Sequence, residues 1–310
     1  MSSKQTKLRI ALAQNSPING PEGTYNPETS KDHPFASVQK NLDKATEFVA
    51  SAAKQGADVV VFPEYFLQGI VNEGRQYLCL SSDHLTAHLQ DLAKKHNISI
   101  VGTIVHGKLP SSHSAALPSV SPFTSSDAAR KEWVEYLKAN PPSDEQVAEP
   151  TLHNTAFFID ENGRVLGEYI KKNLWHPERD YLTAGEESHE VFDTKWGKAG
   201  FLICWDISHP AAAQSLTDKS VDIVFCPIYW LGTDSEPAIN DHEHDEDYER
   251  QLTSALCFAR AFETETVWIM CNAGGNNEKD LIGGSGVWAP LRGRLGGFDG
   301  SDEAVKPLFH

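Results

Sequence analysis

The chain has 310 residues, of which 40% are hydrophobic and 23% are charged, as is typical of a soluble globular protein. This length is sufficient for one large α/β domain. A formal net charge of −16 and a pI near 5.2 argue against DNA or RNA as a partner.

The start of the chain shows no secretory signal, and no apolar stretch approaches the roughly 18 residues that a membrane span needs. The cysteines are odd in number and form no C-x-x-C pair, which argues against a disulfide framework and a structural zinc site. We therefore expect a cytoplasmic protein without a membrane partner. The five cysteines are Cys79, Cys204, Cys226, Cys257 and Cys271.

The first third of the chain alternates between strand and helix patterns. Apolar residues between 37 and 55 recur at spacings of three and four, which predicts an amphipathic helix that ends at Gly56. The run 57–63 is continuously apolar and stops at a proline, as expected of a strand that is covered on both faces. The predicted order is strand 8–14, helix 37–55, strand 57–63, helix 81–96 and strand 98–105.

Residues 108–150 differ in character from the segments around them. They are rich in Ser and Pro at first and then carry the charged run "DAARKEWVEYLKAN", which predicts one helix in a surface insertion. Two strand-like runs around a Glu-Asn-Gly turn follow at 153–170 and predict a hairpin.

The second half of the chain again alternates between strand and helix patterns. Two short strands meet at a turn at Gly197, and the apolar run from Ala199 to Cys204 predicts a buried strand. An acidic loop occupies 233–248, and a glycine-rich tail closes the chain. Strands that alternate with helices, with hairpins between them, predict a layered α/β domain with a mixed sheet. The remaining predicted elements are helix 209–217, strand 221–227, a helix that ends near 265, and strand 266–272.

Three reactive side chains stand beside predicted strands: Glu64 in "VVVFPEYF", Lys171 or Lys172 in "GEYIKKNL", and Cys204 in "GFLICWDISHP". A thiol attacks as the thiolate, whose formation a nearby cation or a helix N-terminus favours. A glutamate can take the thiol proton and later give it to a leaving amine. A lysine, with the backbone N–H after the cysteine, can stabilise an oxyanion. The set suits acyl transfer from nitrogen, although strand alternation does not choose between the two lysines.

In order and spacing, the segments "FPEYF", "YIKKNLWHPER" and "GFLICWDISHP" resemble the signature segments of the nitrilase superfamily of carbon–nitrogen hydrolases. The resemblance runs from "LRIALAQNSP" to about "GSGVWAPLRG" and includes "ARAFETETVWIMCNAGG". It implies a single hydrolase domain over 1–310 with a four-layer αββα sandwich fold. It also implies a homodimer or a higher homo-oligomer that forms through a helical face.

The resemblance also implies roles for individual residues. Glu64 would be the general base, Cys204 the nucleophile and Lys171, rather than Lys172, the oxyanion-stabilising lysine. Glu178 would orient the lysine or the substrate. Two aromatic residues, Tyr65 and Trp230, are candidates for the substrate pocket, and the backbone N–H of Trp205 would complete the oxyanion hole.

The sequence departs from the family pattern in two places. The insertion at 108–150 is long, and we expect it to tune substrate access. The tail after Gly293 lacks the apolar closing strand and the dimer-forming extension that the family pattern leads us to expect.

The expected substrate is a small molecule, a linear amide or an N-carbamoyl compound, with a nitrile as the alternative. In the family, Trp directly after the cysteine is typical of nitrilases, whereas the following Asp206 is typical of many amidases and carbamoylases. Both groups of substrate can be attacked by a cysteine, glutamate and lysine set without a cofactor.

Three other functions fit the sequence less well. A Cys–His hydrolase would pair Cys204 with a residue such as His209, but no protease-like neighbourhood surrounds either. Metal binding through His242 and His244 is disfavoured because the acidic loop has no fixed ligand spacing, so we expect no metal site. A catalytically inactive scaffold is disfavoured because all three catalytic residue types are present.

Overall fold

The computed structural model describes residues 7–309 apart from residues 24, 109–115, 125, 141–150 and 276–279. Its strands form two six-stranded sheets. The first sheet has the order β12 (Ala304–Phe309), β1 (Arg9–Gln14), β2 (Val59–Val61), β3 (Ser99–Lys108), β4 (Thr151–Ile159) and β5 (Val165–Ile170). The second has the order β11 (Gly293–Gly297), β10 (Gly286–Ala289), β9 (Val267–Asn272), β8 (Ile223–Ile228), β7 (Gly197–Phe201) and β6 (Val191–Thr194).

Both sheets are mixed and share one design. In the first sheet β1, β2 and β3 are parallel, whereas the strands beyond them pair antiparallel. In the second sheet β7, β8 and β9 are parallel and are likewise flanked by antiparallel strands. Parallel neighbours need crossover connections, which helices supply. The crossover helices are α1 (Ala36–Lys54), α2 (Ser82–His96), α4 (Pro210–Thr217) and α5 (Tyr248–Thr264).

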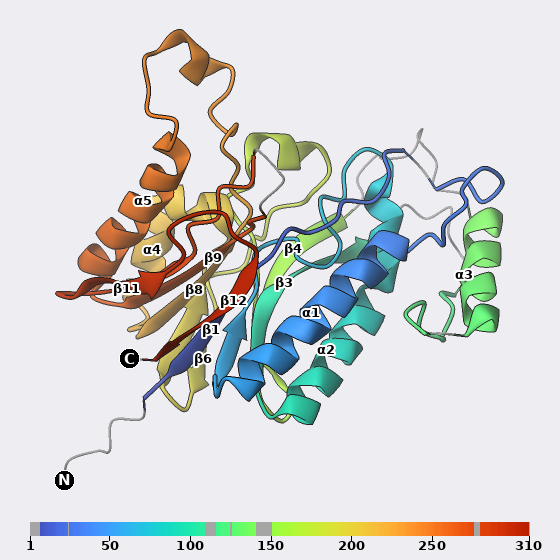
Figure 1. Cartoon of the computed structure of the whole chain (residues 1–310), viewed down its shortest axis with the longest axis horizontal. Coiled ribbons are helices and arrows are strands. Elements are labelled where there is room, and N and C mark those ends of the chain that lie inside the picture. The colour runs from blue at the N-terminus through green and yellow to red at the C-terminus, as the bar shows by residue number, and fades with distance from the viewer. Residues whose placement is uncertain are drawn as a thin grey trace.

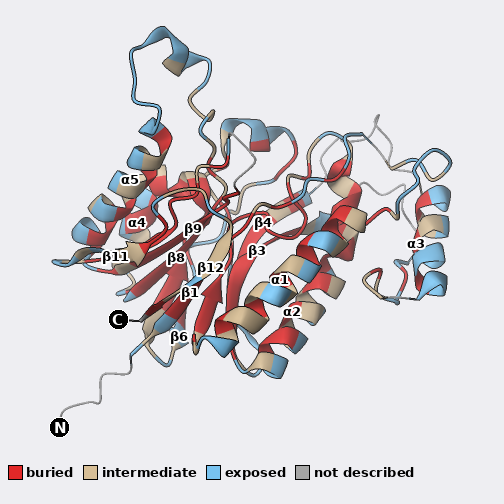
Figure 2. Cartoon of the chain, in the orientation of Figure 1, coloured by how far each residue is buried: buried red, intermediate tan, exposed pale blue. Residues whose placement is uncertain are grey.

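The helices cover the outer faces of the two sheets, α1 and α2 on the first and α4 and α5 on the second (Figure 1). The predicted helix 37–55 is confirmed as α1, whose buried face includes Val38, Leu42 and Val49. Between the sheets, the ring of Phe158 in β4 lies 5.6 Å from that of Phe225 in β8. The central strands are buried almost throughout, whereas the outer strands β5, β6, β11 and β12 are only partly buried, and each covering helix is buried mainly on one face (Figure 2). The αββα order of four layers is confirmed.

The end of the chain corrects the sequence analysis, which expected no closing strand after Gly293. The structure has two strands there, and β12 pairs antiparallel with β1 along six residue pairs from Arg9–Phe309 to Gln14–Ala304. Proline has no backbone N–H to donate to a neighbouring strand. Pro307 is tolerated because β12 is an edge strand, with a neighbour on one side only. The last strand of the chain therefore completes the first sheet beside its first strand.

The described part of the insertion contains the predicted helix, α3 (Asp127–Ala139), which lies at the periphery of the fold (Figure 1). Residues 109–115 and 141–150 of the insertion lie outside the described residues. Trp133 of α3 is fully buried, its ring lies 5.1 Å from that of Phe35, and its indole N–H donates to the carbonyl of Val120. The insertion helix is thus anchored to the core, and its effect on substrate access stays a prediction.

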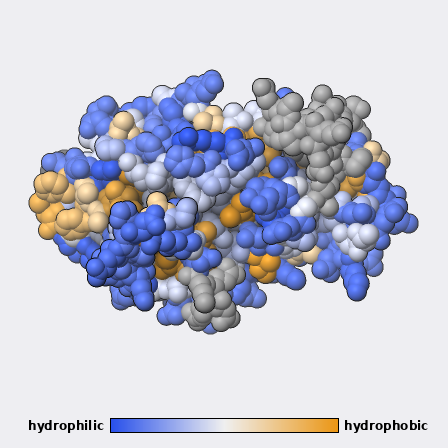
Figure 3. Space-filling view, turned by 90° about the horizontal axis from the view of Figure 1, so that it is seen from above, coloured by the Kyte–Doolittle hydropathy of each residue, from blue (hydrophilic) through white to orange (hydrophobic). Residues whose placement is uncertain are grey.

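Large apolar side chains are exposed on α5 and on the β10–β11 turn, namely Phe258, Phe262 and Leu291. Apolar surface gathers at this end of the molecule (Figure 3). An oligomer that forms through a helical face stays a prediction. Among the described residues, no helix combines the length and apolar character that a membrane span requires.

Candidate active site

The three predicted catalytic side chains meet where strands of the two sheets end. Glu64 follows β2, Lys171 follows β5 and Cys204 follows β7. Lys171 Nζ lies 2.8 Å from Glu64 Oε1, and the Cys204 thiol lies close enough to the same carboxylate to lower its pKa. The exposed fractions of the three residues are 1%, 1% and 6%, in chain order. The fold therefore brings a thiol, a carboxylate and an ammonium together in a buried place.

The structure distinguishes the two lysines that sequence alternation left open. Lys171 is buried between Glu64 and Glu178, whereas Lys172 is half-buried and is no part of this cluster. Consecutive residues at the end of a strand point to opposite faces, so only one of the pair can reach the site.

Glu178, the second predicted glutamate, lies on a short 3₁₀ helix (His176–Asp180). Its Oε1 accepts hydrogen bonds from Lys171 Nζ at 2.8 Å and from Tyr65 Oη at 2.5 Å. Its Oε2 accepts the backbone N–H of Trp175 at 2.8 Å. Fixed by these donors, Glu178 can orient the ammonium of Lys171, which also contacts Glu64.

Glu64 is held by two further donors that the sequence analysis missed. Asn154 Nδ2 donates to Glu64 Oε1 at 2.7 Å, and the backbone N–H of Tyr229 donates to Oε2 at 3.0 Å. Asn154 lies within β4 and belongs to none of the recognised segments, so no local signal marks it. Both contacts fix the carboxylate in place beside the thiol.

The sequence analysis expected a strand that ends at Cys204, and the structure corrects this expectation. β7 stops at Phe201, and Cys204 begins a 3₁₀ helix (Cys204–Ser208) with a φ of 45°. A left-handed backbone conformation is uncommon at a residue with a Cβ, and it persists only where the surrounding structure enforces it. The turn projects the thiol into the cavity between the sheets' ends.

The turn around Cys204 is enforced by the buried carboxylate of Asp206. Its Oδ2 accepts the backbone N–H of Ile203 and the hydroxyl of Tyr169, both at 2.9 Å. Its Oδ1 accepts the backbone N–H of Asn173 at 2.9 Å and the Asn173 side-chain amide at 2.7 Å. Asp206 thereby ties the cysteine turn to the segment that follows Lys171.

Burial dominates the electrostatics of the site. Burial and the neighbouring Glu64 raise the pKa of the Cys204 thiol well above its ordinary value, although Lys171 acts in the opposite direction. Burial also raises the pKa of Glu64 to about 7, against the lowering effect of Lys171. The thiol is therefore protonated at rest, and a base must remove its proton during the reaction. Lys171 lowers the pKa of the thiol, as expected of a nearby cation, but burial and Glu64 outweigh this effect.

A cavity of about 80 Å³ opens onto Cys204. A water molecule needs roughly 10–15 Å³ on this measure, so the space suits a small acyl group. The predicted pocket residues Tyr65 and Trp230 both line it, as does Trp205, whose ring lies 5.5 Å from that of Trp230. The full lining comprises Glu64, Tyr65, Ile70, Asn72, Lys171, Trp175, Pro177, Glu178, Tyr181, Cys204, Trp205, Tyr229, Trp230, Leu231 and Asp234.

The histidines raised by the sequence analysis lie elsewhere. His209 Nδ1 is 3.0 Å from the carbonyl oxygen of Trp205, whereas the thiol shares the candidate cavity with Glu64, and His209 does not line that cavity. His242 and His244 are exposed in the acidic loop before α5. Within the described part of the chain, no group of three or more His, Cys, Asp or Glu side chains could hold a metal ion.

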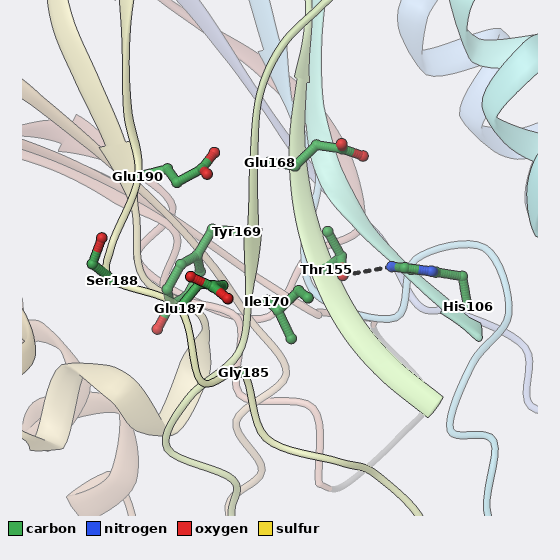
Figure 4. A pocket seen from close by; sticks show the side chains of 9 residues that line it. All are labelled: His106, Thr155, Glu168, Tyr169, Ile170, Gly185, Glu187, Ser188 and Glu190. Carbon is green, nitrogen blue, oxygen red and sulfur yellow. Dashed lines mark hydrogen bonds between the residues drawn. The ribbon is translucent and has the colours of Figure 1, made fainter. Parts of the chain in front are cut away.

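A second cavity, of about 230 Å³, lies beside β5 (Figure 4). Glu168, Glu187 and Glu190 line it, but none of the predicted catalytic residues does. Tyr169 connects the two regions, because its ring lines this cavity and its hydroxyl binds Asp206. Although the second cavity is larger, no cysteine or lysine is among the described residues that line it, so the smaller cavity, with Glu64, Lys171 and Cys204, is the candidate active site.

The family model described as carbon-nitrogen hydrolase matches residues 9–299. The chain is 26% identical to 2-oxoglutaramate amidase of Bacillus subtilis, with 88% of this chain and 85% of the relative covered. It is 24% identical to pantetheinase of Mus musculus, and this match covers 93% of this chain and 52% of the relative. It is 28% identical to nitrilase 1 of Arabidopsis thaliana, and this match covers 72% of this chain and 54% of the relative.

The matched residues span about half the length of the mouse pantetheinase, which is longer than this chain, and about three fifths of the length of a probable nitrilase of Schizosaccharomyces pombe. Among solved structures, an amidase of Nesterenkonia sp. matches with a TM-score of 0.67 at 20% identity, with 99% of this chain and 92% of that chain covered. A likeness at this identity supports the fold. In a variant of that amidase, an acetamide moiety is attached covalently to the active site cysteine.

Proposed function

The chain belongs to the carbon-nitrogen hydrolase family, and we propose that it cleaves a non-peptide C–N bond of a small linear amide or N-carbamoyl compound through a covalent Cys204 intermediate. In this proposal Glu64 is the general base and Lys171 stabilises the oxyanion. One observation carries it: the thiol, the carboxylate and the ammonium lie together in one small buried cavity.

The first half-reaction follows from the contacts of Glu64. Glu64 takes the proton of the Cys204 thiol as the sulfur attacks the carbonyl carbon and the C=O electron pair moves onto the oxygen. Lys171 Nζ and the backbone N–H of Trp205 stabilise that oxyanion. When the tetrahedral intermediate collapses, the C–N bond breaks, Glu64 gives its proton to the leaving nitrogen, and an acyl thioester remains on Cys204.

The second half-reaction needs only water. Glu64, again ionised, takes a proton from a water molecule as that water attacks the thioester carbonyl. The C–S bond then breaks, the proton returns to the sulfur, and a carboxylic acid leaves. No cofactor takes part in either half.

Amide and nitrile hydrolysis share this machinery, and relatives of both kinds are found. The amide is favoured because Glu64, with its pKa near 7, can be both the base for the thiol and the acid for a leaving amine. We expect purified protein to release ammonia from small aliphatic amides or N-carbamoyl compounds and not from matched nitriles. Turnover of the nitriles alone would overturn the assignment and support the nitrilase alternative.

The pH dependence should report the ionisation of Glu64. Because burial raises its pKa to about 7, the base form is lost as the pH falls through that value. With a neutral amide such as butanamide, kcat/KM should therefore fall about tenfold per pH unit below pH 7. If kcat/KM stays constant from pH 5 to pH 8, Glu64 is not the base in the rate-determining proton transfer.

A further inference from the structure

One carboxylate in the candidate cavity has no part in the proposed reaction. Asp234 lies in the loop after β8 and lines the cavity beside Trp230 and Leu231. Its Oδ2 accepts the backbone N–H of Leu231 at 3.0 Å. Among the described residues, Oδ1 has no hydrogen-bond partner and no Lys or Arg forms an ion pair with Asp234. This oxygen is therefore available to a ligand.

The charge around Asp234 favours a cation. Lys171 is the one basic residue among the described residues that line the cavity, and Glu64 and Glu178 already hold it. Glu249 is buried and contacts Trp230, which lines the cavity. Its Oε2 accepts the indole N–H of Trp230 at 2.8 Å, while its Oε1 has no partner among the described residues. Burial, together with Glu249, raises the pKa of Asp234 to about 7, against the lowering effects of the Leu231 N–H and of Lys171, so a ligand cation beside Asp234 would favour its ionised form.

Much of the remaining lining is aromatic, and a cation placed over an aromatic face is attracted by the ring quadrupole. Six aromatic side chains line the cavity: Tyr65, Trp175, Tyr181, Trp205, Tyr229 and Trp230. A carboxylate together with aromatic faces is a recognition site for an ammonium or guanidinium group, whereas a carboxylate on the substrate would meet repulsion there.

We propose that the substrate carries a positive charge at the end remote from the scissile C–N bond, and that Asp234 binds this group while the carbonyl carbon lies at Cys204. The substrate class is then a small amide or N-carbamoyl compound with a terminal ammonium or guanidinium group. This inference rests on the proposed function, because the same cavity must present the carbonyl to the thiol.

The test compares substrates that differ only in charge. The probes are 3-aminopropanamide against butanamide and 5-aminopentanamide against hexanamide, in which an ammonium replaces a methyl group. A hydrogen bond to a charged group corresponds to roughly a 10–100-fold preference, which we expect in kcat/KM for the ammonium member of at least one pair. Asp234→Asn keeps an acceptor for Leu231 N–H and should bring this ratio close to one. Glu236→Gln, an exposed change in the same loop, should keep the wild-type ratio.

Binding to Cys204→Ala protein, measured by calorimetry, separates this inference from the proposed function. If wild-type protein hydrolyses no amide but the alanine variant still binds the ammonium members more tightly, the hydrolytic proposal fails and the cation site stands. A wild-type ratio at or below one in both pairs would overturn the cation site. So would a preference that survives unchanged in Asp234→Asn.

Discussion

Replacement of Cys204 with alanine should abolish ammonia release, with a loss of about 10⁴-fold or more in kcat. The reason is that no other group in the cavity can form the covalent intermediate, and water attack without it has to rely on the oxyanion donors alone. Alanine keeps the Cβ and therefore tolerates the φ of 45° as well as cysteine does. Circular dichroism and the thermal midpoint should accordingly stay close to those of wild-type protein.

The other four thiols provide the control, since all five cysteines are free and buried. Cys257→Ala, in α5, removes a thiol that does not line the cavity and should retain activity. With iodoacetamide, the first adduct located by mass spectrometry should lie on Cys204, because this thiol alone among the five faces the cavity. A first adduct on another cysteine, with hydrolysis retained, would contradict the assignment.

The layered fold was predictable because its core elements carry strong local patterns. The apolar spacing over 37–55 and the continuous run at 57–63 correspond to α1 and β2. β12 was missed because Lys306 and Pro307 weaken its strand pattern. Its partner β1 lies almost 300 residues earlier, so that only the folded chain brings the two strands together.

The candidate site was predictable to the extent that it lies in recognisable segments. Glu64, Lys171 and Cys204 each belong to such a segment and meet in the fold. Asn154 and Asp234 do not, because one lies inside a hairpin strand and the other in an acidic loop. Their contribution depends on where they point, which periodicity and composition do not determine.

The two adjacent lysines allow a matched test of the oxyanion assignment. Lys171→Met removes the ammonium but retains much of its volume, and the loss of one oxyanion donor costs about 10²–10³-fold in kcat. The change also leaves Glu64 and Glu178 buried together without a cation. Since Lys171 lowers the pKa of Glu64, its removal should raise that pKa further, so less of the base form remains at neutral pH.

Lys172→Met is the control, because this half-buried side chain lies outside the Glu64–Glu178 cluster and should change kcat by no more than about threefold. Removal of one partner of a buried ion pair costs about 3–5 kcal/mol, so the folded fraction of each variant is measured by chemical denaturation before rates are compared. The acid limb of the Lys171→Met pH profile should move to higher pH, whereas that of Lys172→Met should not. If both variants lose the same activity, the lysine register taken from the sequence is wrong. If Lys171→Met loses activity without any shift of the acid limb, the lysine and Glu64 do not act as a coupled pair.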